Sequence, residues 1–346
     1  MENGTFSVGI DLGGTKLLAC LIDENWQVKE EVKKKTRPER GHQAVVERIV
    51  EVVDTLIEKS GQTKDSIKAI GIGVPGTVDS VSGTVIYAPN MPGWNQIPIG
   101  TMLHERLNLP VAVGNDVNMG LFGEHHFGAA RGYNYVVGVF VGTGVGGGLI
   151  VEGKLVHGAN NLAGEFGHMV IQRKLNGRIC GCGNRGCLEA YAGRKSIVQK
   201  IASRRDTDGY SSMLKGMDFD ALTSGKLNKA LKQNDRLVTK TIKTACKDIG
   251  SGIASLLNIL DPEVIVLGGG VIEAMADFMF PLIQQAVKEH TLSYDTRKTN
   301  NVLSQLGDHA VALGAAYMFL IRFRLFPPVI LFKVHSGKPY EKVCQF

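Results

Sequence analysis

One imidazole and three thiols stand close together in the segment EFGHMVIQRKLNGRICGCGNRGCLE (165–189). The four side chains are those of His168, Cys180, Cys182 and Cys187. Three thiolates and one imidazole complete the tetrahedral coordination of Zn²⁺ and leave no position for water, which is typical of a structural site. The intervening glycines allow the tight bends that would direct three sulfur atoms at one ion. Three unrelated buried cysteines are the alternative, but this spacing favours the metal.

Two carboxylates flank the predicted zinc ligands. Glu165 lies three residues before His168, and Glu189 lies two residues after Cys187. Clamping the ligands on one ion would therefore fix carboxylates from two separate segments. We interpret the zinc as structural and the two carboxylates as groups that bind a ligand.

A glycine-rich turn between two strands occurs twice. VGIDLGGTKLLACLID (8–23) aligns with VGVFVGTGVGGGLIVE (137–152), so that Gly13 falls opposite Gly142. Two copies of a strand–turn–strand unit predict a duplicated fold with two equivalent lobes. Either turn alone is a weak signal, since each could be a simple hairpin. Facing each other, their N–H groups and threonine hydroxyls could cradle a polyphosphate.

A third glycine turn, at residues 268–270, follows an apolar strand and opens a predicted helix. The N-terminus of a helix after such a turn is suited to anionic or nucleotide ligands, because its N–H groups are unpaired. Taken alone, a tight strand-to-helix turn without a ligand explains the glycines equally well.

The hydrophobic pattern predicts the elements that must position these groups. Apolar runs and alternation predict strands, and apolar residues three and four apart predict helices. Residues 204–234 are polar, and we expect a lid-like or variable region there. The predicted strands are 6–11, 16–23, 28–36, 67–74, 111–114, 135–141, 147–151 and 264–267, and the predicted helices are 42–59, 99–107, 117–127, 188–203, 238–260 and 271–289.

Length and composition indicate a soluble protein of two domains. The chain has 346 residues, of which 44% are hydrophobic and 21% charged, and its net charge of +6 is mild. A solvated strand face explains the basic run 33–35 better than nucleic acid binding does. Three cysteines are clustered and three are scattered, which indicates metal binding in a reducing compartment. Without a secretory leader or a convincing membrane span, we expect a cytoplasmic protein.

Four motifs together resemble the ROK family, which groups bacterial repressors, open-reading-frame proteins and sugar kinases among the actin-like ATPases. The motifs are DLGGT (11–15), the pair Asn115–Asp116, EFGH (165–168) and CGCGNRGCLE (180–189), of which the last is the most specific. The resemblance runs from about Ser7 to Tyr317. It implies an α/β fold of two ribonuclease-H-like lobes, with ATP, Mg²⁺ and a hexose bound between them.

The same resemblance implies the division of the chain. We expect residues 1–117 to form a small N-terminal lobe that the C-terminal helix 308–326 completes. Residues 118–307 would form a large lobe with the nucleotide site and the zinc-binding loop. The family pattern fades near the C-terminus, where residues 320–346 match nothing expected and residues 327–346 form an atypical tail.

The resemblance also gives residues for each ligand. The glycine turns would bind phosphate, nucleotide and Mg²⁺ through Asp11, Gly13, Gly14, Thr15, Lys16, Gly142, Thr143, Gly144, Gly268, Gly269 and Gly270. A hexose presents hydroxyls that both donate and accept, so its site needs polar groups. Gly76, Asn90, Asn115, Asp116, Glu165, His168 and Glu189 would supply these groups. Asp116 opens a predicted helix, where an N-cap is the alternative role, but the surrounding set favours a general base.

The implied reaction is ATP-dependent phosphorylation of D-glucose at its 6-hydroxyl, a glycolytic step that gives glucose 6-phosphate and ADP. The segment PNMPGWNQIP (89–98) and the full carboxylate set resemble the glucokinase branch. Phosphorylation of N-acetylmannosamine or of another hexose or amino sugar is the alternative. A sugar-responsive repressor of this family would carry a preceding helix-turn-helix domain, for which the first strand leaves no room. We expect a homodimer or homotetramer.

Overall fold

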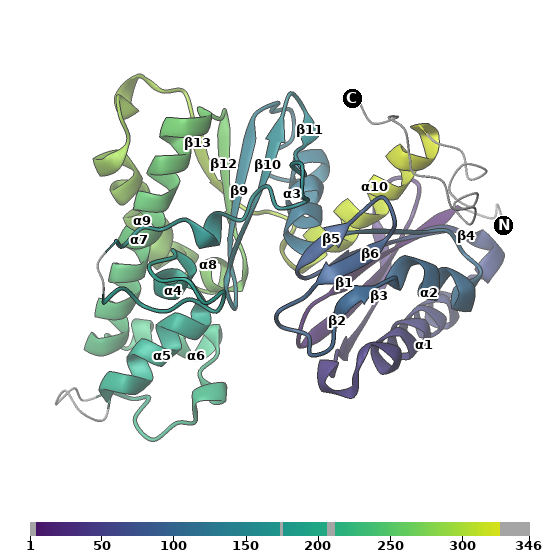
Figure 1. Ribbon diagram of the computed structural model, residues 1–346, viewed down its shortest axis with the longest axis horizontal. Coiled ribbons are helices and arrows are strands. Elements are labelled where there is room, and N and C mark those ends of the chain that lie inside the picture. The colour runs from purple at the N-terminus through teal and green to yellow at the C-terminus, as the bar shows by residue number, and fades with distance from the viewer. Residues whose placement is uncertain (1–4, 174–175, 206–211, 326–346) are drawn as a thin grey trace.

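Two five-stranded mixed sheets with the same strand order form the protein (Figure 1). The computed structural model describes residues 5–173, 176–205 and 212–325. The orders are β3-β2-β1-β4-β8 and β11-β10-β9-β12-β13. In each sheet the first three strands of this order pair antiparallel. The last two strands run parallel to the central strand of the sheet, which is β1 in the first sheet and β9 in the second. The predicted α/β fold and the internal repeat are therefore confirmed.

Eight of the ten strands in these two sheets agree with predicted strands to within a few residues, whereas the two edge strands of the second sheet, β11 and β13, were not predicted. The first sheet contains β1 (Phe6–Leu12), β2 (Lys16–Ile22), β3 (Val28–Lys35), β4 (Ile67–Val74) and β8 (Val111–Asn115). The second contains β9 (Val136–Val141), β10 (Val145–Val151), β11 (Lys154–Leu155), β12 (Val264–Gly268) and β13 (Asn300–Leu303). A small sheet of β5 (Thr77–Asp79), β6 (Thr84–Tyr87) and β7 (Asn95–Ile97) was not predicted, because such short strands leave no readable period.

Helices cover both faces of the first sheet. They are α1 (His42–Ser60) and α2 (Ile99–Leu107) on one face and α10 (Ala310–Leu325) on the other. Successive residues of β2 point to opposite faces, so Leu17 joins the core beside α1 while Leu18 joins the core beside α10. Gly9 lies under α10, and a Cβ atom there would overlap the carbonyl oxygen of Ala312. The glycine therefore lets α10 pack directly against β1.

The second sheet is also covered on both faces. Val137 of β9 packs in the large core with α7 (Arg236–Leu260) and α9 (Ala276–His290). Val136 packs on the opposite face with Leu121 of α3 (Asp116–Phe127). Figure 1 shows α3 and α10 between the two sheets, and the two helices pack against each other. The helix that begins at Asp116 is thus held from both sides. The predicted lobe boundary near residue 117 stays a prediction.

Two predicted helices are each divided in two, and one helix lies where none was predicted. The predicted helix 188–203 is broken at Gly193 into α4 (Glu189–Ala192) and α5 (Arg194–Arg205), because Gly193 adopts an extended ψ of 146°. The predicted helix 271–289 is divided at Met275 into α8 (Gly270–Ala274) and α9. The polar region 204–234 contains α6 (Ser224–Lys232), whose Leu227 is fully buried in the large core, and its lid-like or variable character stays a prediction.

Residues 206–211 and the predicted tail, 327–346, lie outside the described residues. Across the described ranges, no helix combines the length and the apolar character that crossing a bilayer requires.

Candidate functional site

The turn between β1 and β2 is braced by backbone and side-chain hydrogen bonds. The N–H of Gly13 donates to the carbonyl oxygen of Lys16 at 2.9 Å. Thr36, which is buried, donates its hydroxyl to the carbonyl oxygen of Gly13 at 2.6 Å and its N–H to that of Thr15 at 3.1 Å. The hydroxyl-bearing Thr15 itself is exposed. This turn therefore has a fixed backbone and an exposed rim.

Asp11 and Asp116 meet at one edge of the first sheet, because β1, β4 and β8 are parallel and end there. Burial and the neighbouring Asp116 raise the pKa of Asp11 to about 7, against the opposing effect of Lys16. Burial raises the pKa of Asp116 to about 6, and the charge of Glu165 adds to this shift. The surrounding protein supplies too little positive charge for these carboxylates, which fits a site for a hard divalent cation such as Mg²⁺.

Asn115 takes the capping role at the start of α3. Its Oδ1 accepts from the N–H of Asn118 at 3.0 Å, and its Nδ2 donates to the carbonyl oxygen of Gly76 at 3.0 Å. Asp116 Oδ1 accepts from the N–H of Val117 at 2.9 Å and from Asn115 Nδ2 at 3.1 Å. Among the described residues, Oδ2 has no hydrogen-bond partner. The Asp116 carboxylate is thus oriented by one oxygen while the other is available.

The second glycine turn is built directly against a predicted sugar-site carboxylate. The N–H of Val145 donates to Glu189 Oε2 at 3.0 Å. A Cβ atom on Gly144 would overlap the same oxygen, so only glycine fits beside this carboxylate. A residue predicted to bind phosphate and a residue predicted to bind sugar are therefore in contact.

Arg194 also belongs to this turn and was missed in the sequence. Its N–H donates to the carbonyl oxygen of Gly142 at 3.0 Å, and its Nη2 donates to Thr143 Oγ1 at 3.2 Å. The break of the helix at Gly193 makes this arrangement possible, since a Cβ atom there would lie 3.2 Å from Gly144 Cα. The dipeptide after that glycine, Arg194–Lys195, was the available signal, but the prediction of one continuous helix hid it.

The remaining predicted residues lie near these turns. A Cβ atom on Gly269, whose φ is +87°, would lie 2.7 Å from the carbonyl oxygen of Val141, so the 268–270 turn adjoins the second glycine turn. One on Gly14 would lie 3.9 Å from Asn90 Cβ. Lys16 Nζ pairs with Asp308 Oδ2 at 2.6 Å. Its ammonium group is therefore tied to the segment that enters α10.

The four predicted zinc ligands lie together, with all four ligand atoms within 4.8 Å of one another. Cys182 Sγ lies 3.8 Å from Cys187 Sγ, and Cys180 Sγ lies 3.6 Å from His168 Nδ1. Tetrahedral Zn²⁺ with Zn–S bonds of about 2.3 Å and Zn–N bonds of about 2.0–2.1 Å separates two sulfurs by about 3.8 Å and sulfur from nitrogen by about 3.5 Å. The two closest spacings therefore fit Zn²⁺ without rearrangement.

Both predicted sugar-side carboxylates touch this cluster. His168 Nε2 lies 3.9 Å from Glu165 Oε2, and Cys180 Sγ lies 3.5 Å from Glu189 Oε1. Burial raises the pKa of Glu165, His168 lowers it, and Glu189 raises it further. The imidazole can serve both roles predicted for it, because Nδ1 faces the thiols and Nε2 faces the carboxylate.

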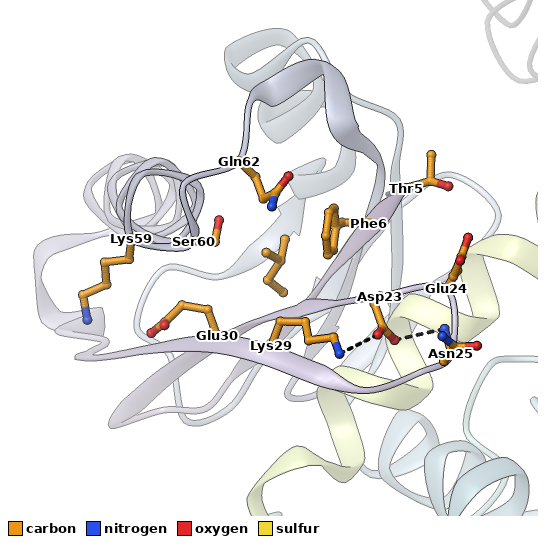
Figure 2. Close-up of a pocket in the computed structure, with 11 residues that line it drawn as sticks. Thr5, Phe6, Asp23, Glu24, Asn25, Lys29, Glu30, Lys59, Ser60 and Gln62 are labelled. Atoms are coloured by element: carbon orange, nitrogen blue, oxygen red, sulfur yellow. Dashed lines mark hydrogen bonds and ion pairs between the residues drawn. The ribbon is translucent and has the colours of Figure 1, made fainter. Parts of the chain in front are cut away.

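A pocket of about 510 Å³ lies elsewhere, where β1 begins and α1 ends (Figure 2). Its Asp23 carboxylate is used by its own turn: Oδ1 accepts from the N–H of Asn25 at 2.9 Å, and Oδ2 pairs with Lys29 at 2.8 Å. No predicted site residue lines this pocket, and we assign it no part in the candidate site.

Comparison with known proteins gives one consistent family. The model of the ROK family matches residues 7–321. A glucokinase from Thermotoga maritima is 31% identical over 315 residues, which are 89% of this chain and 95% of the relative. The N-acetylgalactosamine kinase AgaK from Shewanella is 36% identical over 291 residues, which are 82% of this chain and 86% of the relative. A xylose repressor from Caldicellulosiruptor bescii is 29% identical, with 92% of this chain and 79% of the repressor covered.

The solved structures agree. The crystal structure of a ROK family glucokinase from Streptomyces griseus, in complex with glucose and AMPPNP, superposes with a TM-score of 0.79 at 32% identity. The match covers 90% of this chain and 98% of that one.

Proposed function

This chain belongs to the ROK family, and from this premise we propose that it is a glucokinase, transferring the γ-phosphoryl group of ATP to the 6-hydroxyl of D-glucose. The observation that carries the proposal is the position of Asp116. Asp116 lies at the same sheet edge as Asp11 of the first glycine turn, and the charge of Glu165 in the predicted sugar-side set raises its pKa. A base at that position can reach a hydroxyl that faces a bound phosphate.

In the proposed mechanism the protein acts mainly by positioning the sugar hydroxyl and the phosphates of ATP. Asp116 Oδ2 accepts the proton of the 6-hydroxyl as that oxygen attacks phosphorus, and a pKa of about 6 suits a base that works near neutral pH. The N–H groups and hydroxyls of the two glycine turns hold the phosphates in line. Mg²⁺, held near Asp11, would supply charge neutralisation on the phosphate oxygens.

The sugar-side carboxylates favour glucose over an N-acetylated sugar. Glu165 and Glu189 are acceptors only, so each is best matched by a hydroxyl that donates. An N-acetyl group replaces one such donor and needs more space. A site built to bond a hydroxyl can reject an analogue without it by about 10⁴-fold, because its own polar group is left unpaired. The 36% identity to an N-acetylgalactosamine kinase makes an amino sugar the second candidate.

A panel of sugars tests the proposal. We expect kcat/KM for glucose to exceed that for N-acetylglucosamine, N-acetylgalactosamine and N-acetylmannosamine by at least about tenfold, with mannose as the epimer control. If kcat/KM for an amino sugar exceeds that for glucose by that factor, the kinase assignment stands and the assignment of glucose as substrate is wrong. If the purified chain binds sugar but phosphorylates none of them, a sugar-responsive regulator replaces the kinase.

A second prediction concerns the phosphate donor. Arg194→Ala should raise KM for ATP about tenfold and leave KM for glucose nearly unchanged, since a charge-assisted hydrogen bond contributes about 1.5–3 kcal/mol and Arg194 is only partly buried. Arg204→Ala, an exposed arginine near the other end of α5, is the matched control and should change neither constant. Equal rises in both KM values would mean that Arg194 supports the turn and does not contact phosphate.

A further inference from the structure

A second group of metal-ligand side chains lies outside the candidate site. It consists of Cys20, Glu31 and His309, whose ligand atoms all lie within 4.8 Å of one another. One thiol, one carboxylate oxygen and one imidazole nitrogen are ligand types that Zn²⁺ accepts in combination. Three protein ligands would leave a fourth position for water or another ligand, in contrast to the closed set of three thiols and one imidazole described above.

The fold brings these residues together from three separate segments. Cys20 of β2 is directly opposite Glu31 of β3 in the antiparallel register, so the two side chains share one face of the sheet. That face is the one covered by α10, since Cys20 packs with Ala312 and Ala316. His309 lies in the 3₁₀ turn Gly307–His309, which leads into α10 and brings the imidazole over the same face.

We propose that Cys20, Glu31 and His309 form a further divalent-cation site, selective for a borderline-soft ion such as Zn²⁺ over Mg²⁺. The thiolate selects against hard cations, and it neutralises a divalent ion together with the carboxylate. Cys20 is fully buried, whereas the side chains of Glu31 and His309 are 36% and 38% exposed. An ion can therefore enter from the carboxylate and imidazole side and reach a sulfur inside the protein.

This site is less preformed than the thiol-rich one. His309 Nε2 lies 2.6 Å from Glu31 Oε2, and Glu31 Oε1 pairs with Lys33 at 2.9 Å. Tetrahedral Zn²⁺ separates a nitrogen and an oxygen ligand by about 3.3 Å, so the two side chains must part by roughly 0.7 Å. Both are partly exposed and can move. We therefore expect weaker binding here, and a chelator should remove this ion first.

Metal counting tests the proposal without reference to kinase activity. The full chain, loaded with excess Zn²⁺ and freed of unbound metal by gel filtration, should carry about two zinc ions. Cys20→Ala and, separately, His309→Ala should each reduce this to about one. Cys246→Ala removes another fully buried cysteine, in α7, that belongs to neither ligand group, and it should keep about two.

Co²⁺ adds a spectroscopic readout. In a background in which Cys180, Cys182 and Cys187 are all replaced by serine, Co²⁺ should still give a thiolate charge-transfer band, and adding Cys20→Ala should abolish it. Half-exposed His309 serves as the test position if Cys20→Ala does not fold. One zinc ion per wild-type chain, or two in the His309→Ala variant, would overturn the proposal.

Discussion

Asp116→Asn is expected to lower kcat for sugar phosphorylation by about 10²–10⁴-fold while the variant still binds sugar. The amide can accept the hydrogen bond from the N–H of Val117 that now orients the carboxylate at 2.9 Å, so α3 should begin as before. What is lost is the ability to take a proton from the attacking hydroxyl. Steady-state kinetics and sugar titration of the purified variant measure the two properties separately.

Asp277→Asn is the matched control, because Asp277 is an exposed carboxylate in the first turn of another helix, α9. It should retain wild-type turnover. Near-normal turnover in the Asp116 variant would remove Asp116 from the role of base. Loss of sugar binding together with turnover would instead make it a binding residue.

Local features of the sequence predicted most of the fold. The repeat around Gly13 and Gly142 was readable because strand–glycine turn–strand patterns are contiguous, and the two sheets have the same strand order. The thiol ligands were readable for the same reason, since Cys180, Cys182 and Cys187 lie in one short loop. A contiguous pattern indicates the geometry of a single segment, and the glycine turns and the cysteine loop are each formed mainly within one segment.

Contacts between distant segments could not be read in this way. Glu124 is fully buried, and its Oε1 accepts from Ser304 Oγ at 2.7 Å and from the N–H of Leu306 at 2.8 Å. It thereby joins α3 to the segment that leads into α10. Thr36, Arg194 and the Cys20–Glu31–His309 group depend on similar long-range contacts. A single sequence gives the residue types, but it does not show which distant segments come into contact in the fold.

Substitution of a predicted zinc ligand is the other change with a large expected effect. Cys187→Ser should abolish stoichiometric zinc binding at the thiol-rich cluster, since Cys187 is fully buried among the ligands and serine does not supply a thiolate. Sugar affinity should then fall about 10²-fold, because a displacement of roughly 1 Å at a positioning group can have that cost. Nucleotide affinity should change much less.

The asymmetry follows from the contacts of the cluster. His168 Nε2 lies 3.9 Å from Glu165, and Cys180 Sγ lies 3.5 Å from Glu189, so both sugar-side carboxylates depend on the clamped ligands. The second glycine turn also contacts Glu189, through the N–H of Val145, so it should be disturbed in part. The first glycine turn is braced instead by Thr36, which follows β3 of the first sheet. Elemental analysis with separate glucose and ATP titrations decides the matter, and Cys246→Ser serves as the control for a buried thiol outside both clusters. Equal losses for both ligands would show that the zinc supports the whole fold, and an unchanged sugar affinity would separate the metal from the sugar site altogether.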